Sequence, residues 1–372
     1  MLGQLVRGCC VVFLVFAVVQ GQAFAQRSSE LDRLNDEVNM LFARGRLSDA
    51  IPLAKRALEL TSKAFGPNHQ KVGLAATGLA NMLRENGQFS EAELHYKNAL
   101  AILKSGREED EAHLGRALSN FGSLYHLWSR PLEAEVLMKQ AIPKLEKQLG
   151  PDHLDVGVAL STNAAVLQAL GRHEDALPIM KRSVDIRQLR AGNSHPSLAT
   201  AFNNLAVIYW SMGRHAESSL AHQRALAIFE ETLGPWHSAV ANSALNLAST
   251  YQSLGEHLKA DQMYLKGLQV LERTSGPGSP QTISAMNNYA SFLWEQGRVV
   301  EAEKILRSVV SAMKQKHGAA NVALASPLGI LGTLYKHLER YAEAEATLKE
   351  ALLIIEETRP CTQFSVGMGL EQ

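Results

Sequence analysis

The sequence predicts an all-α fold, a right-handed α-solenoid (superhelix) of about eight helix–turn–helix repeats. The first observation is a short turn, Gly-Arg-x-x-x-Ala or a close variant, that recurs every 42 residues without insertion or deletion. The second is that apolar residues on both sides of each turn follow helical spacing. Self-similarity at a constant period of this length is typical of stacked repeats. The turns begin at Gly45, Gly87, Ser129, Gly171, Gly213, Gly255, Gly297 and Glu339.

Composition fits this class and excludes some functions. The chain has 372 residues with 37 basic and 37 acidic side chains, so no net field favours nucleic acid or an anionic membrane surface. Apolar residues make up 46%, which is enough for a continuous core, and aromatics make up only 6%, which favours close helix packing over a β-sandwich. We therefore expect no nucleic-acid partner.

Residues 1–25 have the three parts of a secretory signal peptide. A short start carrying Arg7 precedes an apolar run from Cys9 to Val19, and Ala23-Phe24-Ala25 supplies a small-x-small cleavage pattern. The run is too short to cross a bilayer comfortably. We expect cleavage near Ala25-Gln26 and a secreted or periplasmic chain, with an uncleaved amino-terminal membrane anchor as the alternative. Cleavage would leave Cys361 as the single cysteine, so no disulfide is expected.

The solenoid is expected over residues 26–358, followed by a tail at 359–372. The fifth repeat is the clearest example. Pro196 opens its first helix, where a missing N–H leaves no bond unmade, and Gly213 ends that helix. The second helix ends at Leu233-Gly234-Pro235, because proline cannot continue it. Small residues recur in register and let helix axes approach to about 8–10 Å. They are Ala206, Ser218 and Ala225 here, Ala80, Ala92 and Ala99 in the second repeat, and Ala248, Ala260 and Gly267 in the sixth.

This pattern resembles the tetratricopeptide repeat in the 42-residue form found in kinesin light chain. The standard repeat has about 34 residues, and the extra residues lengthen the two helices by about two turns in total. Proteins of this family generally bind partners rather than catalyse, so the resemblance implies a protein or peptide partner. It covers about residues 29–358 and is carried by Asn203-Asn204-Leu205-Ala206, Gly213-Arg214, Ala225-Leu226 and Leu233-Gly234-Pro235-Trp236-His237.

Several places depart from the repeat pattern, and we expect the helices or linkers there to be irregular. The first repeat opens with a charged, loosely patterned helix around residues 31–41, as expected of a solvated cap. Ser129-Arg130-Pro131 lacks the turn glycine, and Pro143 is expected to bend or break its helix. If the solenoid has hinges, they are expected at the irregular linkers 105–111 and 275–281.

Histidines are the most conspicuous candidates for chemistry. His69, His153, His195 and His237 occupy the same place in the turn between repeats. A metal ion needs its ligands at about 2.0–2.1 Å, whereas equivalent residues of stacked repeats lie on the order of 20 Å apart. We therefore interpret these histidines as helix caps, and the column of His215 and His257 fails as a metal site for the same reason. No HExxH, paired CxxC, GxSxG or phosphate-loop spacing occurs, so we expect no metal, no cofactor and no catalytic residue.

The better candidate for function is the side of each first helix that turns away from the second helix. Core positions lie four, seven, eight and eleven residues before the turn, so positions three, six, ten and thirteen before it lie opposite. The resemblance implies that this side lines a concave groove. Asn, Ser and Gln can bond the backbone of an extended peptide there, and tryptophans offer flat anchors. The candidates are Asn81, Arg84, Ser119, His126, Asn203, Trp210, Asn242, Ser249, Gln252, Asn287, Trp294 and Lys336.

Other interpretations stay open. Any soluble solenoid has polar residues on outer helix faces, and the two tryptophans can equally be packing residues. The adjacent column of Asn120, Asn204, Asn246 and Asn288 is expected to bond a neighbouring helix. The main hypothesis is an exported scaffold that holds an extended partner segment in its groove. One alternative is an enzyme, such as a metal-dependent hydrolase, or a regulatory subunit with an unrecognised His/Asp site.

A third hypothesis is an assembly platform that self-associates through its carboxyl-terminal helix. Leu352, Leu353, Ile354 and Ile355 form an apolar end in the last repeat. An apolar patch of this kind is expected to be covered, either by the tail at 359–372 or by a partner.

Overall fold

The computed structural model describes residues 30–105, 111–318 and 321–358. The predicted signal peptide, the tail at 359–372 and most of the linker at 105–111 lie outside the described residues. Within these ranges every regular element is a helix, so the predicted all-α class is confirmed. The chain forms two compact units, Met1–Gly192 and Asn193–Gln372, which are taken separately below.

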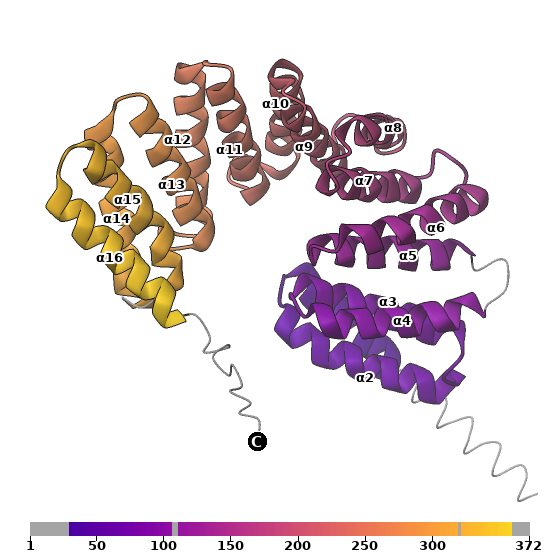
Figure 1. The fold of residues 1–372 in the computed structure, drawn as a ribbon. Coiled ribbons are helices and arrows are strands. Elements are labelled where there is room, and N and C mark those ends of the chain that lie inside the picture. Colours follow the sequence, from indigo (N-terminus) through magenta and orange to yellow (C-terminus); the bar gives the residue numbers. More distant parts are fainter. Residues whose placement is uncertain (1–29, 106–110, 319–320, 359–372) are drawn as a thin grey trace, which may run out of the picture. The chain divides into compact units, whose positions relative to one another are not determined.

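The first compact unit contains four helix pairs that follow the predicted repeats (Figure 1). Each helix packs against the next along the chain, and the first helices α3, α5 and α7 also contact one another in succession. This is the contact pattern of stacked repeats. The pairs are residues 30–43 with α2 (Leu47–Phe65), α3 (Gln70–Glu85) with α4 (Phe89–Lys104), α5 (Glu111–Leu127) with α6 (Pro131–Leu149), and α7 (Leu154–Ala169) with α8 (His173–Ala191).

The second compact unit contains the remaining four pairs. Its helices also pack in chain order, and a short 3-10 turn, η2 (Val322–Leu324), precedes the first helix of the last pair. The pairs are α9 (Pro196–Ser211) with α10 (His215–Leu233), α11 (Ser238–Ser253) with α12 (His257–Thr274), α13 (Pro280–Glu295) with α14 (Val299–His317), and α15 (Ala325–His337) with α16 (Tyr341–Thr358).

The turn inside each pair depends on a left-handed residue. Gly213 has φ 71°, its N–H donates to the carbonyl of Trp210 at 2.9 Å, and the N–H of Arg214 donates to that of Tyr209 at 2.9 Å. Glycine adopts this backbone conformation without steric penalty. The two repeats without the glycine keep the same turn, because Ser129 and Glu339 adopt φ 57° and 56°.

The histidines between repeats are helix caps. The side chain of His69 accepts a hydrogen bond from the backbone N–H of Lys71 at 3.1 Å, and His153, His195 and His237 repeat this bond at the start of α7, α9 and α11. The bond satisfies one of the first N–H groups of a helix, which have no partner within the helix. The prediction that these residues cap helices is confirmed.

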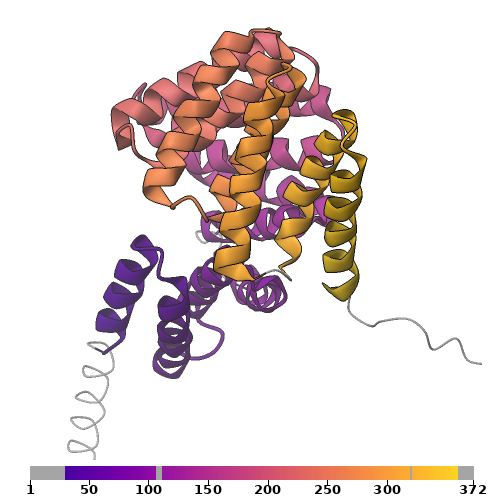
Figure 2. The same ribbon diagram turned by 90° about the vertical axis from the view of Figure 1, so that its left-hand side faces the viewer.

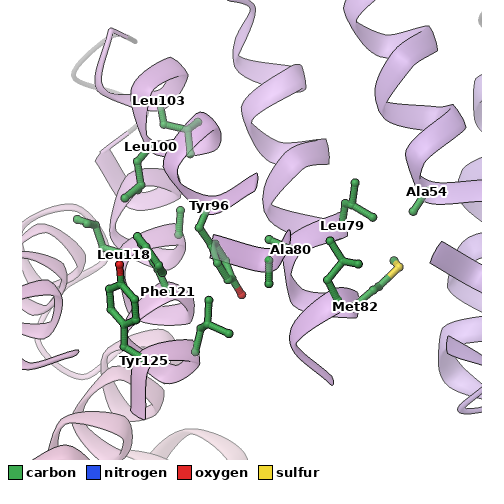
Figure 3. Close-up of a cluster of buried hydrophobic side chains, with 14 of the residues drawn as sticks. Ala54, Leu79, Ala80, Met82, Tyr96, Leu100, Leu103, Leu118, Phe121 and Tyr125 are labelled. Atoms are coloured by element: carbon green, nitrogen blue, oxygen red, sulfur yellow. The ribbon is translucent and has the colours of Figure 1, made fainter. Parts of the chain in front are cut away.

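One buried cluster runs through most of the first compact unit, from Val38 to Val166. In the first compact unit Leu79, Tyr96 and Phe121, from α3, α4 and α5, point into one cluster (Figure 3). The rings of Tyr96 and Phe121 stack with centroids 5.2 Å apart. The small-residue columns are closed to solvent, as expected where helices approach closely: Ala80, Ala92, Ala99, Ala206, Ser218, Ala225, Ala248 and Ala260 are all fully buried.

The irregular places predicted from the sequence are partly described by the structure. Pro143 does not break its helix, since α6 continues from Pro131 to Leu149; a bend at this proline stays a prediction. The ring of Pro143 lies on the exposed side of α6. Proline has no N–H to donate to the carbonyl of Lys139, but Lys139 is also exposed, so water can reach that carbonyl. Around the irregular linkers at 105–111 and 275–281, α4 packs on α5 and α12 packs on α13. An irregular linker therefore does not interrupt packing between the helices it joins. Hinges at these linkers stay a prediction.

Candidate functional site

The predicted groove residues differ in how far solvent reaches them. We call the side of the first helices that carries them the helix-A face. Trp210, Asn242 and Lys336 are exposed, and Ser119 and Asn287 are buried. The others are half-buried: Asn81, Arg84, His126, Asn203, Ser249, Gln252 and Trp294.

The position ten residues before the turn does not lie on the open side of the first helix, contrary to the prediction. Ser119, Asn203 and Asn287 stand ten residues before the turn, and in the fifth repeat this position faces the second helix of the same pair. At the position nine residues before the turn, Asn246 and Asn288 are exposed, whereas Asn120 and Asn204 are half-buried. A bond from this column to a neighbouring helix stays a prediction. One residue rotates the side chain by about 100°. The open side therefore follows positions three, six, nine and thirteen before the turn.

Asn203 shows what the buried position does. Its Oδ1 lies 2.9 Å from Nδ1 of His222 on α10 and accepts a hydrogen bond from the hydroxyl of Ser243 on α11 at 3.1 Å. Since a carboxamide oxygen only accepts, the neutral imidazole carries its proton on Nδ1. Burial lowers the pKa of His222 to about 4, so the ring is neutral at physiological pH. Asn203 thus joins three helices from two repeats.

A hollow of about 160 Å³ opens beside this cluster in the second compact unit. It is lined by Val207 and Trp210 of α9, His222 of α10, and Asn246, Ser249 and Thr250 of α11. Trp210 is 46% exposed, and its Nε1–H donates to the hydroxyl of Ser253 at 3.3 Å. The indole is therefore held at one edge of the hollow while much of its surface stays accessible.

Several other candidates are bonded to neighbouring helices. Gln252 accepts from the hydroxyl of Tyr264 at 2.8 Å and donates to Glu295 at 2.6 Å, which joins α11, α12 and α13. The hydroxyl of Tyr96 donates to Asn81 at 2.5 Å. These polar side chains join helices within and between repeats, so a ligand would have to compete with existing bonds to use them.

The remaining candidates are divided between packing and solvent. The ring of Trp294 meets His337 edge-on with centroids 5.0 Å apart, and the indole is half-buried. Arg84 reaches the backbone carbonyl of Asn120 at 3.4 Å. Burial lowers the pKa of His126, so this ring also favours its neutral form. Lys336 is the exposed cation among the candidates.

The hollow includes residues that the sequence did not single out. His222 stands nine residues after its turn, where the other repeats hold Ala54, Tyr96, Met138, Met180, Tyr264, Leu306 and Leu348. An ionisable residue in a column of mostly apolar ones is the signal that could have identified it. Val207 and Thr250 carry no comparable signal, because Val and Thr are common in helices of any kind.

Two other kinds of site are absent from the described ranges. No group of three or more His, Cys, Asp or Glu side chains is placed to hold a metal ion in the part of the chain described. Among the described helices, none combines the length and apolarity that crossing a bilayer requires.

The chain is similar in fold to several solved repeat proteins. BtubC (BKLC) from P. vanneervenii is 21% identical with a TM-score of 0.54, over 64% of this chain and 97% of that chain. TPR-like repeats of the kinesin light chain kind from Podosopora anserina are 21% identical with a TM-score of 0.52, over 56% and 98%. Aspartyl phosphate phosphatase F from Bacillus subtilis is 14% identical with a TM-score of 0.55, over 93% and 97%. No curated protein sequence matches.

A family model matches most of the repeats. The tetratricopeptide repeat model matches residues 34–105, 155–231, 239–291 and 281–357, which together make up more than half of the chain. The constant period of 42 residues and the capped turns agree with this match and with the kinesin light chain type of repeat. The chain belongs to the tetratricopeptide repeat family.

Proposed function

We propose that this protein is an exported scaffold that binds an extended segment of a partner protein on the helix-A face of its second compact unit. The observation that carries the proposal is the hollow beside Trp210, which opens on that face and has both apolar and polar walls. Family membership supports a role in protein interaction, because stacked repeats offer long surfaces for binding rather than a single enclosed site.

The size of the hollow selects the kind of group that enters it. A volume of about 160 Å³ is smaller than the roughly 300–1,000 Å³ of pockets that hold whole small molecules. An engineered cavity of about 150 Å³ holds one benzene ring. We infer that the hollow receives one aromatic or branched apolar side chain, which would pack against Trp210 and Val207.

The polar groups around the hollow suit a peptide backbone. An extended segment presents N–H and C=O groups that need partners, and carboxamides and hydroxyls both donate and accept. Asn242 and Asn246 on α11 are exposed, and Ser249 is half-buried at the wall of the hollow. Side chains of an extended segment alternate, so one would enter the hollow while its neighbours point away.

Capture of the partner with matched tryptophan variants tests the proposal. Trp210→Ala removes the anchor on the helix-A face, whereas Trp236→Ala removes a similarly exposed indole in the turn between α10 and α11. Tagged wild-type protein should retain a partner from its native cell envelope, Trp236→Ala should retain it too, and Trp210→Ala should lose it with unchanged helical circular dichroism. Retention of the partner by Trp210→Ala at wild-type level would refute the proposed surface.

Export is the second part of the proposal. It rests on the charged, apolar and small-residue segments of residues 1–25. Mass spectrometry of the amino-terminal peptide of the protein purified from its native cells should show a start at Gln26, as free glutamine or as its cyclised form. An intact amino terminus in the membrane fraction would instead support the anchored alternative.

A further inference from the structure

The last helix, α16, carries an exposed apolar stripe. The equivalent residues of the preceding repeat are buried. Leu348, Leu352 and Ile355 lie on one side of α16, since they are spaced four and three residues apart. They are 40%, 55% and 38% exposed, and Tyr341 extends the stripe to the start of the helix at 64%. Figure 2 shows α16, in yellow, at an edge of the second compact unit.

Comparison with the preceding repeat shows that this stripe is an uncovered packing surface. Residues 42 positions earlier on α14 are Leu306, Val310 and Met313, and they are 1%, 8% and 2% exposed. Val310 and Met313 share one buried cluster with residues of the following repeat, including Leu324 of η2 and Leu328 of α15. No helix follows α16 in the part of the chain described, so the equivalent side chains stay open. Ile354 was predicted to belong to this apolar end, but it is buried.

We propose that residues 359–372 of the same chain cover this stripe as an extended segment. Phe364, Val366, Met368 and Leu370 alternate with Gln363, Ser365, Gly367 and Gly369. Strict alternation places all four apolar side chains on one side of an extended chain. Pro360 and the two glycines disfavour a helical continuation of α16.

The lengths of the two surfaces match. Phe364 to Leu370 spans about 20 Å at about 3.3 Å per extended residue. Tyr341 to Ile355 spans about 21 Å at 1.5 Å per helical residue. The segment begins at the end of α16, so folding back along the helix brings the four side chains over the stripe without a long connection. Covalent attachment also raises the local concentration of the segment to the millimolar range, which a separate molecule would not reach.

Hydrogen exchange on matched double variants of the full chain tests this inference. Phe364→Asp with Val366→Asp places two charges on the apolar side, and Gln363→Asp with Ser365→Asp places the same charges on the other side. Exchange of α16 amides should quicken about tenfold in the first variant, as in a chain truncated after Thr358, and stay at the wild-type rate in the second. The mass by light scattering should remain that of a monomer.

Two results would overturn the inference. Equal α16 exchange in the wild-type, truncated and both double-variant chains would show that these residues do not cover the stripe. Protection that disappears on dilution, together with a doubled mass at high concentration, would identify a second copy of the chain as the occupant instead.

Discussion

Arg298, in the turn between α13 and α14, donates a hydrogen bond of 2.7 Å to Asp261 on α12, 37 residues earlier. The hydroxyl of Tyr289 donates to the same carboxylate oxygen at 2.8 Å, and burial with this bond raises the pKa of Tyr289 to about 12. A turn arginine thus ties its own repeat to the previous one. The same 37-residue relationship joins Arg130 to Glu93, Arg172 to Glu135 and Arg340 to Glu303.

A double-mutant cycle on Arg298 and Asp261 should measure this link. We expect Arg298→Ala and Asp261→Ala to show a coupling of about 0.5–1 kcal/mol in urea unfolding at low salt, because the pair is partly exposed. Added salt should weaken it. The control cycle, Arg46 with Asp49, involves an exposed pair within one turn and should couple less. Equal coupling in the two cycles would contradict a special role in joining repeats.

Asn287 should limit stability rather than bind a partner. Its Oδ1 is buried and has no hydrogen-bond partner among the described residues. The positions that hold His222 and Ser243 for Asn203 hold Leu306 and Pro327 for Asn287. A buried unsatisfied acceptor costs about 1–3 kcal/mol, so Asn287→Leu should raise the free energy of unfolding by about 1–2 kcal/mol. The matched Asn203→Leu change should lower it, and a loss of stability in both variants would be the contrary result.

His222 should make stability depend on pH between about 7 and 4. Burial lowers its pKa from 6.5 to about 4, so between these values the unfolded chain binds more protons than the folded chain. The free energy of unfolding therefore falls as the pH falls, by up to about 3 kcal/mol from this residue. Burial also lowers the pKa of His95 and His126, so the test is the difference between wild type and His222→Gln. Parallel stability profiles for these two proteins would contradict the assignment.

Replacing Ser129 by glycine should raise the free energy of unfolding. A residue with a Cβ at φ 57° is strained relative to glycine, by roughly 1–2 kcal/mol, and part of this is offset by the greater freedom of glycine in the unfolded chain. Ser129→Gly should therefore stabilise by about 0.5–1 kcal/mol in urea unfolding. Gly213→Ala, at φ 71°, should destabilise by about 1 kcal/mol. A destabilising Ser129→Gly change would show that the serine side chain makes a compensating contact.

Local features of the fold were predictable from the sequence. The side that each first helix turns toward solvent was not. The period, the turns and the capping histidines depend on residues close together in the chain, and the structure confirms them. The side that each first helix leaves open depends on its contacts with two neighbours. An offset of one residue therefore separated the buried Asn287 from the exposed Asn288. The hollow was missed because it combines Trp210 with His222 from another helix.

The most direct test of the proposed binding surface is site-specific photocrosslinking in cells that produce the protein. A benzophenone amino acid at Asn242 would sit on the helix-A face, and the same group at Leu258, which is 84% exposed at the start of α12, serves as control. The account predicts a crosslink to one partner protein from position 242, none from 258, and loss of the crosslink with Trp210→Ala. Equal crosslinking of the same partner from both positions, or from 258 alone, would contradict it.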